Sequence, residues 1–298
     1  MAPSTTDTIQ VTEAPPKASG FRRFVRVLFG RKLVLAGVLV IALLLFCAIF
    51  APLISPYNPY APDFGVRLQG PSWQHLLGTD GLGRDTLTRI IYGSRTSLIV
   101  GLVAVFIAST IGMILGLVAG YFEGIVHAII MRCIDALMSI PLIMLSLAIA
   151  SLLGGGLFNI VVALGVAMIP AYARVMCAQA LTVKQNDYVT ASRSLGASNL
   201  RTMLLRVAPN CFPPLLVIMT MQVGMAILAE AGLSFLGVGV FPPQAAWGGM
   251  VSEGYKYLND APMLSFAPGM AIILVVFSFN MVGDGLRDAL DPRLRGIL

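Results

Sequence analysis

Charged residues are scarce in this chain. Only 11% of its 298 residues are Asp, Glu, Lys or Arg, and 57% are hydrophobic, whereas a soluble globular domain carries roughly 25% charged residues. A soluble protein of this length could not remove so much apolar surface from water, so the composition excludes a soluble globular fold. It predicts an all-α polytopic membrane protein, in which each spanning helix satisfies its own backbone groups.

Metal ligands and nucleophiles are also few. The chain holds two histidines, His75 and His127, and four cysteines without a CxxC pair. A structural metal site needs clustered ligands, and neither histidine lies beside a Ser or Cys in a catalytic motif. We therefore expect no metal site, no catalytic residue and no enzymatic activity. The cysteines are expected to be small buried apolar side chains, and they are Cys47, Cys133, Cys177 and Cys211.

A phosphate-binding loop is absent too. Such a loop needs Gly-Lys followed by Ser or Thr, but the four lysines of this chain are followed by Ala, Leu, Gln and Tyr. If ATP drives the system, the nucleotide and its Mg²⁺ bind to another polypeptide. We expect no cofactor in this chain.

Long apolar runs dominate the remainder of the sequence. Six of them approach the ~20 residues that cross a bilayer. They are Leu33–Phe50, Leu98–Ala119, Ile134–Leu153, Ile160–Met176, Leu215–Leu236 and Phe266–Val282. In the second run, Gly112 and Gly116 form a small-xxx-small face on which another helix can pack closely. The sequence therefore predicts six transmembrane helices.

The N-terminal region has two possible interpretations. Residues 1–20 are rich in Pro, Thr, Ser and Ala, which predicts disorder. The basic segment 21–32 and the first apolar run resemble a signal peptide, but the run is long for one and no clean small-x-small site follows it. We interpret it as an uncleaved first span.

The excess of Lys and Arg over Asp and Glu indicates how the chain is oriented in the membrane. The formal net charge is +6 and the pI is about 9.4, which we interpret as a topology signal and not as nucleic-acid binding, because basic residues collect in cytoplasmic loops. With both termini in the cytoplasm, fifteen of the twenty Lys and Arg residues fall inside. The five outside are Arg67, Arg84, Arg89, Arg95 and Lys256. The predicted organisation is a disordered tail (1–20), a first span with an outer loop (21–96), a core transmembrane domain (97–285) with a cytoplasmic loop (184–210), and a cytoplasmic C-terminal tail (286–298).

A polar, basic stretch, residues 187–209, interrupts the apolar sequence. Asn186 or Asp187 can cap a helix, and Tyr188, Ala191, Ser192 and Leu195 share one face of it at i, i+3, i+4 and i+7. Gly196 stands where a helix ends with positive φ, Ser198 can cap a second helix, and Pro209 is expected to stop that helix. The pattern predicts a helical hairpin at the cytoplasmic surface. It either inserts into a groove on a soluble partner or packs on the bundle as a surface loop.

Three other groups of charged residues are candidates for function or packing. Glu230 interrupts the fifth span, either as a gate or substrate-path residue or as the partner of an Arg or a backbone group. An amphipathic outer segment (Arg84, Asp85 and Arg89) either receives a partner or covers a pore, or is a solvated surface helix. Ion pairs are expected to hold the C-terminal tail through Asp284, Arg287, Asp288, Asp291 and Arg293.

Several motifs resemble a known family. Residues 190–209 resemble in part the EAA loop motif (EAA-x3-G-x9-I-x-L-P) of ABC-importer permeases, with matches at Ala191, Gly196 and Pro209. Four positions depart from the motif: Thr190 replaces its Glu, Ser192 its second Ala, Arg206 its Ile and Ala208 its Leu. Three longer segments resemble dipeptide and oligopeptide permeases. They are LLGTDGLGRDTLTRIIYGSRTSL (76–98), AEAGLSFLGVGV (229–240) followed by Trp247-Gly248, and FNMVGDGLRDALDPRLRG (279–296). The resemblance covers residues 21–296 and is to the second, C-type permease of the pair.

This resemblance implies a fold, a set of partners and a role for the hairpin. The fold is that of a type I ABC importer in the bacterial inner membrane. The partners are a homologous second permease, two ATPase subunits that bind ATP and Mg²⁺, and an extracytoplasmic substrate-binding protein. The implied ATPase-coupling residues are Asp187, Tyr188, Ala191, Ser192, Leu195, Gly196 and Pro209.

The implied cargo is a dipeptide or oligopeptide, with glutathione, a nickel chelate or another small solute as the alternative. Two hypotheses from other classes remain open at this stage. One is an ion-coupled secondary transporter, a class that usually keeps titratable groups near the bilayer centre. Glu230 is the only clear candidate for such a group, and it lies off the centre of the fifth span. The other is a membrane scaffold without transport activity.

Overall fold

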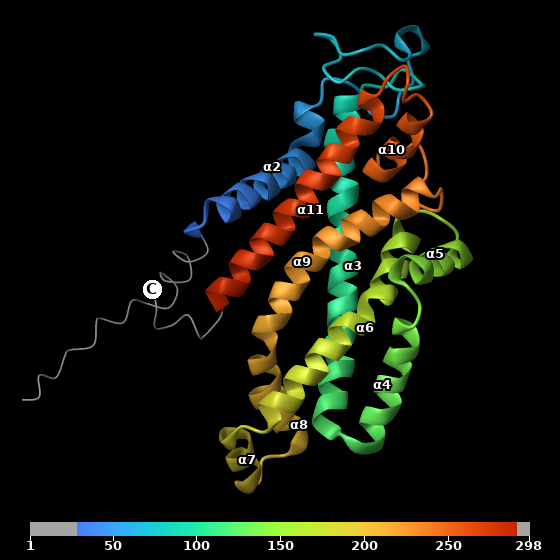
Figure 1. Cartoon of the computed structure of the whole chain (residues 1–298). Helices are drawn as coiled ribbons and strands as arrows, with labels where there is room; N and C mark the ends of the chain where they lie inside the picture. Colours follow the sequence, from blue (N-terminus) through green and yellow to red (C-terminus); the bar gives the residue numbers. More distant parts are fainter. Residues whose placement is uncertain (1–28, 291–298) are drawn as a thin grey trace, which may run out of the picture.

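The computed structural model describes residues 29–290 as a long bundle of helices (Figure 1). No strand occurs in this part of the chain, and Thr79 and Asp85 form an isolated bridge. The principal helices are α2 (Lys32–Ile54), α3 (Thr86–Phe122), α4 (Gly124–Met138), α5 (Leu142–Leu153), α6 (Leu157–Lys184), α7 (Asp187–Ser194), α8 (Asn199–Thr202), α9 (Ala208–Phe235), α10 (Trp247–Tyr255) and α11 (Met263–Leu290).

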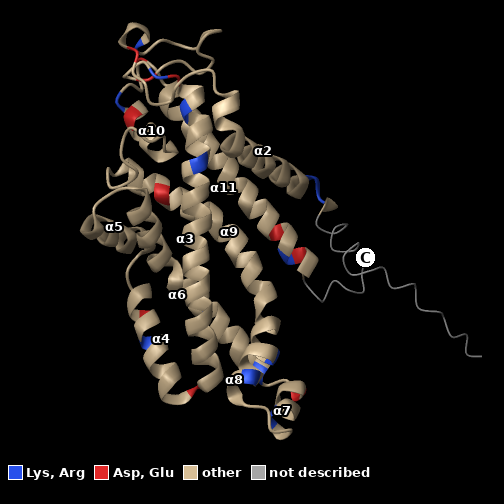
Figure 2. Ribbon diagram, turned by 180° about the vertical axis from the view of Figure 1, so that it is seen from behind, with Lys and Arg blue, Asp and Glu red and all other residues tan. Residues whose placement is uncertain are grey.

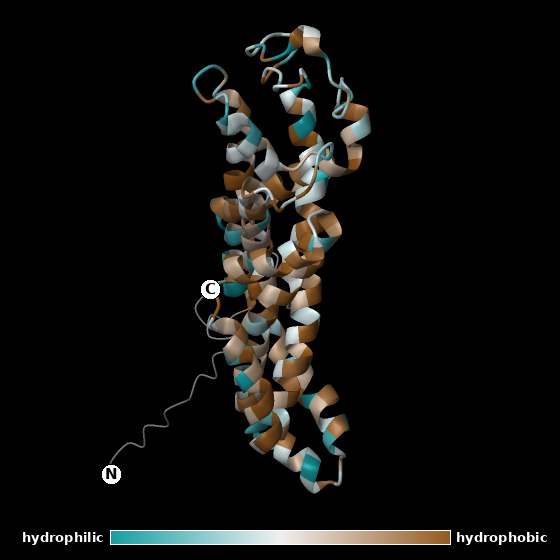
Figure 3. Ribbon diagram, turned by 90° about the vertical axis from the view of Figure 1, so that its right-hand side faces the viewer, coloured by the Kyte–Doolittle hydropathy of each residue, from teal (hydrophilic) through white to brown (hydrophobic). Residues whose placement is uncertain are grey.

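Five helical segments are long and apolar enough to cross a membrane, and a bent pair brings the number to six. Hydrophobic residues dominate the length of the bundle in Figure 3. Figure 2 shows charged residues gathered at the two ends of the bundle, with others on α4 and towards the end of α11. These features confirm an all-α polytopic membrane protein. The predicted disordered segment 1–20 and residues 291–298 lie outside the described residues, while 286–290 continue α11.

Helix α3 runs the length of the bundle and packs closely on α6. Its glycines make this contact possible, because a Cβ added at Gly112, Gly116 or Gly120 would lie 2.7, 2.2 or 2.7 Å from a carbonyl oxygen of α6. The predicted small-xxx-small face is therefore an α3–α6 interface, and it continues for one turn beyond the predicted pair.

This contact predicts a large effect of a side chain at Gly116. We expect Gly116→Leu to force α3 away from α6 and to lower the free energy of unfolding by about 1–3 kcal/mol or more through overpacking. Both the accumulation of the protein in the membrane and its melting temperature in detergent should fall. Gly269→Leu is the matched control, because Gly269 is also helical, yet beyond its own helix backbone a Cβ added there would meet nothing within 4 Å in the described part of the chain. Equal stability of the two variants would contradict the close packing.

The predicted third span, Ile134–Leu153, is not one straight helix. Helices α4 and α5 meet at 90° across residues 139–141. Pro141 precedes α5 with φ −55°, and a residue before proline is disfavoured from the helical region, so Ile140 breaks the helix. Twelve residues of α5 extend only ~18 Å, which is too short to cross the hydrocarbon alone.

The second predicted span begins earlier than its apolar run. Asp85 accepts a hydrogen bond from the Thr88 amide at 2.8 Å and caps α3, so residues 86–97, expected in the outer loop, are helical. The predicted domain boundary at residue 96 thus falls inside α3.

The ends of α2 and α11 lie together. Arg31 forms an ion pair with Asp288 at 2.7 Å, which confirms one ion pair of the predicted C-terminal cluster. The start of α2 and the end of α11 therefore lie side by side, away from the loop that joins α2 to α3 (Figure 1).

Candidate functional site

The predicted hairpin is present at one extreme end of the molecule (Figure 1). Helix α7 ends in a Schellman motif, in which the Gly196 amide donates to the Arg193 carbonyl at 2.9 Å and the Ala197 amide donates to the Ser192 carbonyl at 3.2 Å. Gly196 has φ +84°, as predicted. The Ser198 hydroxyl accepts from the Arg201 amide at 3.4 Å and caps α8.

The second half of the hairpin differs from the prediction. Pro209 does not stop a helix, because α8 continues through a π-helical turn (Met203–Val207) directly into α9. Local π-helical turns are one way in which membrane helices re-satisfy the carbonyls that a proline leaves without a donor. Pro209 thus lies in the first turn of α9 and off the exposed face of α7.

One face of α7 is exposed. Val189 is buried and holds the helix on the bundle, whereas Leu195 is 89% exposed and Tyr188 is 44% exposed. Asp187 begins α7. A surface hollow of about 720 Å³ is lined by Tyr188, Ala191, Ser192, Leu195, Gly196, Ala197, Arg201, Leu205 and Arg206. The structure thus brings together five of the seven predicted coupling residues around one concave surface.

Polar contacts fix the hairpin to the bundle. The Lys184 ammonium donates to the Tyr121 carbonyl at 2.6 Å and pairs with Glu123 at 3.0 Å. The Tyr121 hydroxyl donates to Asn199 Oδ1 at 3.2 Å. The end of α3 therefore contacts both sides of the hairpin, which favours motion of the hairpin together with the helices that carry it.

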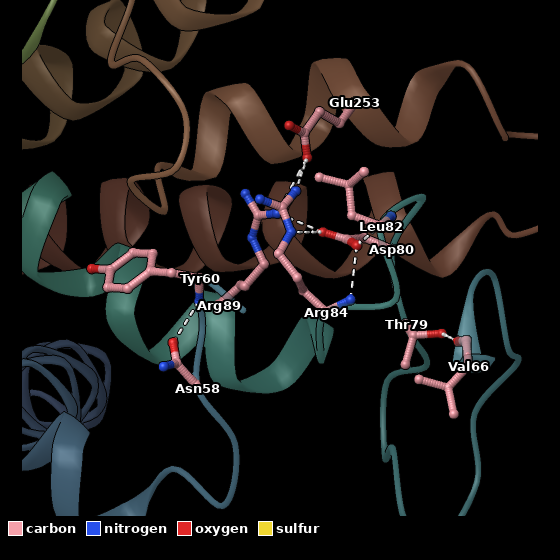
Figure 4. Close-up of polar contacts among 9 residues, drawn as sticks. All are labelled: Asn58, Tyr60, Val66, Thr79, Asp80, Leu82, Arg84, Arg89 and Glu253. Atoms are coloured by element: carbon pink, nitrogen blue, oxygen red, sulfur yellow. Dashed lines mark hydrogen bonds and ion pairs between the residues drawn. The ribbon is translucent and has the colours of Figure 1, made fainter. Parts of the chain in front are cut away.

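A buried charge cluster at the opposite end was not predicted (Figure 4). Asp80 accepts from Arg84 Nε at 2.7 Å and from Arg89 Nη1 at 2.5 Å, and both arginines also pair with Glu253 of α10, at 3.2 and 3.4 Å. One interpretation of the segment with Arg84, Asp85 and Arg89, a solvated surface helix, is wrong, because all three residues are buried. The segment instead ties the loop that joins α2 and α3 to α3 and α10.

Two further contacts join the same regions. His75 Nδ1 lies 2.9 Å from Asp85 Oδ1, and the Trp247 indole donates to the Ile90 carbonyl at 2.9 Å while its ring lies against Gly93. The motif segments 76–98 and 247–248 therefore contact each other. Glu253 was not singled out from the sequence, where it stands as one acid in a short polar stretch. Partial burial raises the pKa of Glu253, and the neighbouring Arg84 opposes that rise.

Glu230 is fully buried within this chain. Its Oε1 accepts a hydrogen bond from the Ser234 hydroxyl at 2.6 Å, whereas Oε2 has no partner among the described residues. In this conformation the carboxylate faces the interior of the subunit, and its predicted role in the path or gate remains a prediction.

The cysteines are less uniform than expected. Cys177 and Cys211 are buried and Cys47 is partly buried, but Cys133 is exposed. Helix α4 buries only Ile134 against the rest of the chain, so the outward-facing Cys133 is not a core residue of this subunit.

Comparison with known proteins identifies the family. Residues 112–296 match the model of the binding-protein-dependent transport system inner membrane component, and residues 19–71 match the N-terminal TM domain of oligopeptide transport permease C. The chain belongs to this permease family. The di/tripeptide transport system permease DppC of Pseudomonas aeruginosa (strain UCBPP-PA14) is 43% identical over 267 residues, 88% of each chain.

A second relative and a solved structure are also similar to this chain. The glutathione transport system permease GsiD of Escherichia coli O6:K15:H31 (strain 536 / UPEC) is 41% identical over 277 residues, 93% of this chain and 90% of that protein. A structure of the MetNI methionine ABC transporter in an inward-facing conformation matches with a TM-score of 0.57 and 18% identity, over 68% of this chain and 96% of that chain. This permease therefore has the type I importer fold.

Proposed function

We propose that this permease is the membrane subunit of an ATP-driven importer and that α7 couples it to separate ATPase subunits. The observation that carries the proposal is the exposed face of α7, held by Gly196 beside a large hollow at the tip of the bundle. A short helix with an aromatic and small residues on its face suits insertion into a groove of a partner. The chain lacks Gly-Lys-Ser/Thr, so ATP and Mg²⁺ bind on the ATPases.

We place the hairpin and both termini in the cytoplasm. The Arg31–Asp288 pair, which joins the two ends of the spanning region, supports an even number of crossings. Two arginines expected outside are buried beside Asp80 and Glu253, and Arg95 donates to the carbonyls of Ala48 and Ile49. These arginines are therefore poor topology signals, whereas Arg193, Arg201 and Arg206 stand exposed on the hairpin.

The proposed cargo is a di- or oligopeptide, delivered by an extracytoplasmic binding protein and passed between this chain and a homologous second permease. The DppC and GsiD relatives support a peptide, because glutathione is itself a tripeptide derivative and a glutathione permease is also similar to this chain.

Reconstitution tests this function. We expect proteoliposomes containing both permeases, the ATPases and the binding protein to accumulate labelled di- or tripeptide only with ATP and to continue after a protonophore is added. Uptake that stops with the protonophore would favour the ion-coupled alternative, and no uptake of any small solute by the complete complex would favour a scaffold. Mass spectrometry of ligand released from the co-purified binding protein would separate peptide from glutathione or a metal chelate.

A further inference from the structure

Helices α6 and α9 are tied together at both ends. At one end the hairpin joins them through the chain itself, from Lys184 to Asn199. At the other end the loop after α9 contacts the loop before α6, where the Gly156 amide donates to the Gly239 carbonyl at 3.1 Å. Figure 1 shows α6 running from α5 to the hairpin and α9 running from the hairpin back towards α5.

A polar network inside α9 shapes the loop that makes this second contact. The Ser234 hydroxyl donates to Glu230 and in turn accepts from the Val240 amide at 3.2 Å. Gly239 fits closely over this serine, because a Cβ added there would lie 1.9 Å from Ser234 Oγ. Glu230 therefore orients the hydroxyl that holds the loop against α9.

The loop before α6, on the other side of this contact, has an equally restricted conformation. Gly154 and Gly156 have φ +79° and +113°, which favours glycine, and the Phe241 ring lies against Gly155 so closely that an added Cβ would be 2.3 Å from it. Asn159 donates to the carbonyls of Leu153 and Gly154 at 2.9 and 2.7 Å. The α5–α6 junction is thus a shaped receptor for residues 239–241.

We propose that Glu230 is a positioning residue of a latch, formed by Glu230, Ser234, Gly239, Val240 and Gly156, that makes α6 and α9 move as one body. With the latch closed, displacement of the hairpin is transmitted to the far ends of both helices, roughly 42 Å along the 28 residues of α9. With the latch open, α6 and α9 separate at that end and absorb the motion. This inference rests on the proposed coupling function of α7.

The latch differs from a substrate-path role for Glu230 in what it requires. The latch needs an oxygen that accepts from Ser234, which an amide oxygen also supplies, whereas recognition of a cationic amino group needs the negative charge. Glu230→Gln therefore separates the two roles, and Glu230→Ala removes both.

The test measures peptide taken up per ATP hydrolysed in the reconstituted complex. We expect Glu230→Gln to stay within about twofold of the unmodified protein, and Glu230→Ala and Ser234→Ala to lower this ratio about tenfold with hydrolysis retained and KM unchanged, since each breaks a buried hydrogen bond. Ser278→Ala is the matched control, because among residues 29–290 the buried Ser278 hydroxyl donates only to the Leu274 carbonyl of its own helix.

Hydrogen exchange on the purified permease gives an independent readout. We expect faster exchange in peptides covering 154–160 and 236–243 for Glu230→Ala and Ser234→Ala, and unchanged exchange for Glu230→Gln and Ser278→Ala. Equal loss of uptake in Glu230→Gln and Glu230→Ala with a raised KM, or unchanged exchange in Ser234→Ala, would overturn the latch. Absence of transport by the unmodified complex would instead overturn the proposed function and leave the exchange result standing.

Discussion

Gly196→Pro is expected to abolish uptake and substrate-stimulated ATP hydrolysis while the chain still inserts into the membrane. Gly196 has φ +84°, whereas proline is fixed near −65°. Proline would also remove the amide that donates to the Arg193 carbonyl at 2.9 Å. The Schellman turn could not form, so α7 would lose the orientation that presents Tyr188 and Leu195. The measurement is ATPase co-purification followed by uptake in proteoliposomes.

A graded series at the same position controls for nonspecific damage. Apart from its two chain neighbours, a Cβ added at Gly196 would meet no atom of residues 29–290 within 4 Å, so the effect of a substitution depends on the backbone conformation at this position. We expect Gly196→Asn to be mild because Asn tolerates the left-handed region, Gly196→Ala to cost about 1–2 kcal/mol of hairpin stability, and Gly196→Pro to be the most severe. Normal coupling in Gly196→Pro would refute the proposed role of α7.

Asp80→Ala is expected to unfold the outer loop. The Asp80 carboxylate accepts from the side chains of Arg84 and Arg89 and from the amides of Leu82 and Arg84. Its removal leaves two buried guanidinium groups without their main partner, which typically costs about 3–5 kcal/mol. We expect a lower melting temperature and rapid tryptic cleavage after Arg84 and Arg89, which are 4% and 2% exposed in the intact protein.

Asp260→Ala is the control for this effect. Asp260 also lies towards the outer end but is exposed, and its carboxylate makes no ion pair or side-chain hydrogen bond within residues 29–290. We expect its melting temperature and tryptic pattern to match those of the unmodified protein. Resistance of Asp80→Ala to trypsin at these two arginines would mean that the charge cluster does not hold the loop.

Much of the fold could be predicted because it depends on local sequence. Apolar runs located the spans, and the positive φ of Gly196 followed from its place at the end of a short amphipathic helix. The 90° bend at Pro141 and the continuation through Pro209 were mispredicted. Proline restricts the chain in both cases, and the surrounding helices decide whether the restriction produces a break or a π turn.

The charge cluster could not be predicted from local pattern. Arg84 and Glu253 are 169 positions apart, and a polar segment between two spans is ordinarily solvated. The latch could not be predicted from local pattern either. The sequence indicated only that Glu230 is unusual in an apolar span and that Ser234 follows it by one helical turn. The contact between Gly239 and Gly156, which are far apart in the sequence, is known only from the structure.

The side of the membrane on which the hairpin lies can be measured with two single cysteines in a chain whose native cysteines are replaced by serine. Leu195, at the end of α7, and Trp73, in the loop that joins α2 to α3, are 89% and 97% exposed. Figure 1 shows α7 and that loop at opposite ends of the molecule. We expect a membrane-impermeant maleimide to label Trp73→Cys in intact cells, to label Leu195→Cys only in inverted vesicles, and to lose access to Leu195→Cys when the ATPases bind. Labelling of Leu195→Cys from outside intact cells would contradict a cytoplasmic coupling hairpin.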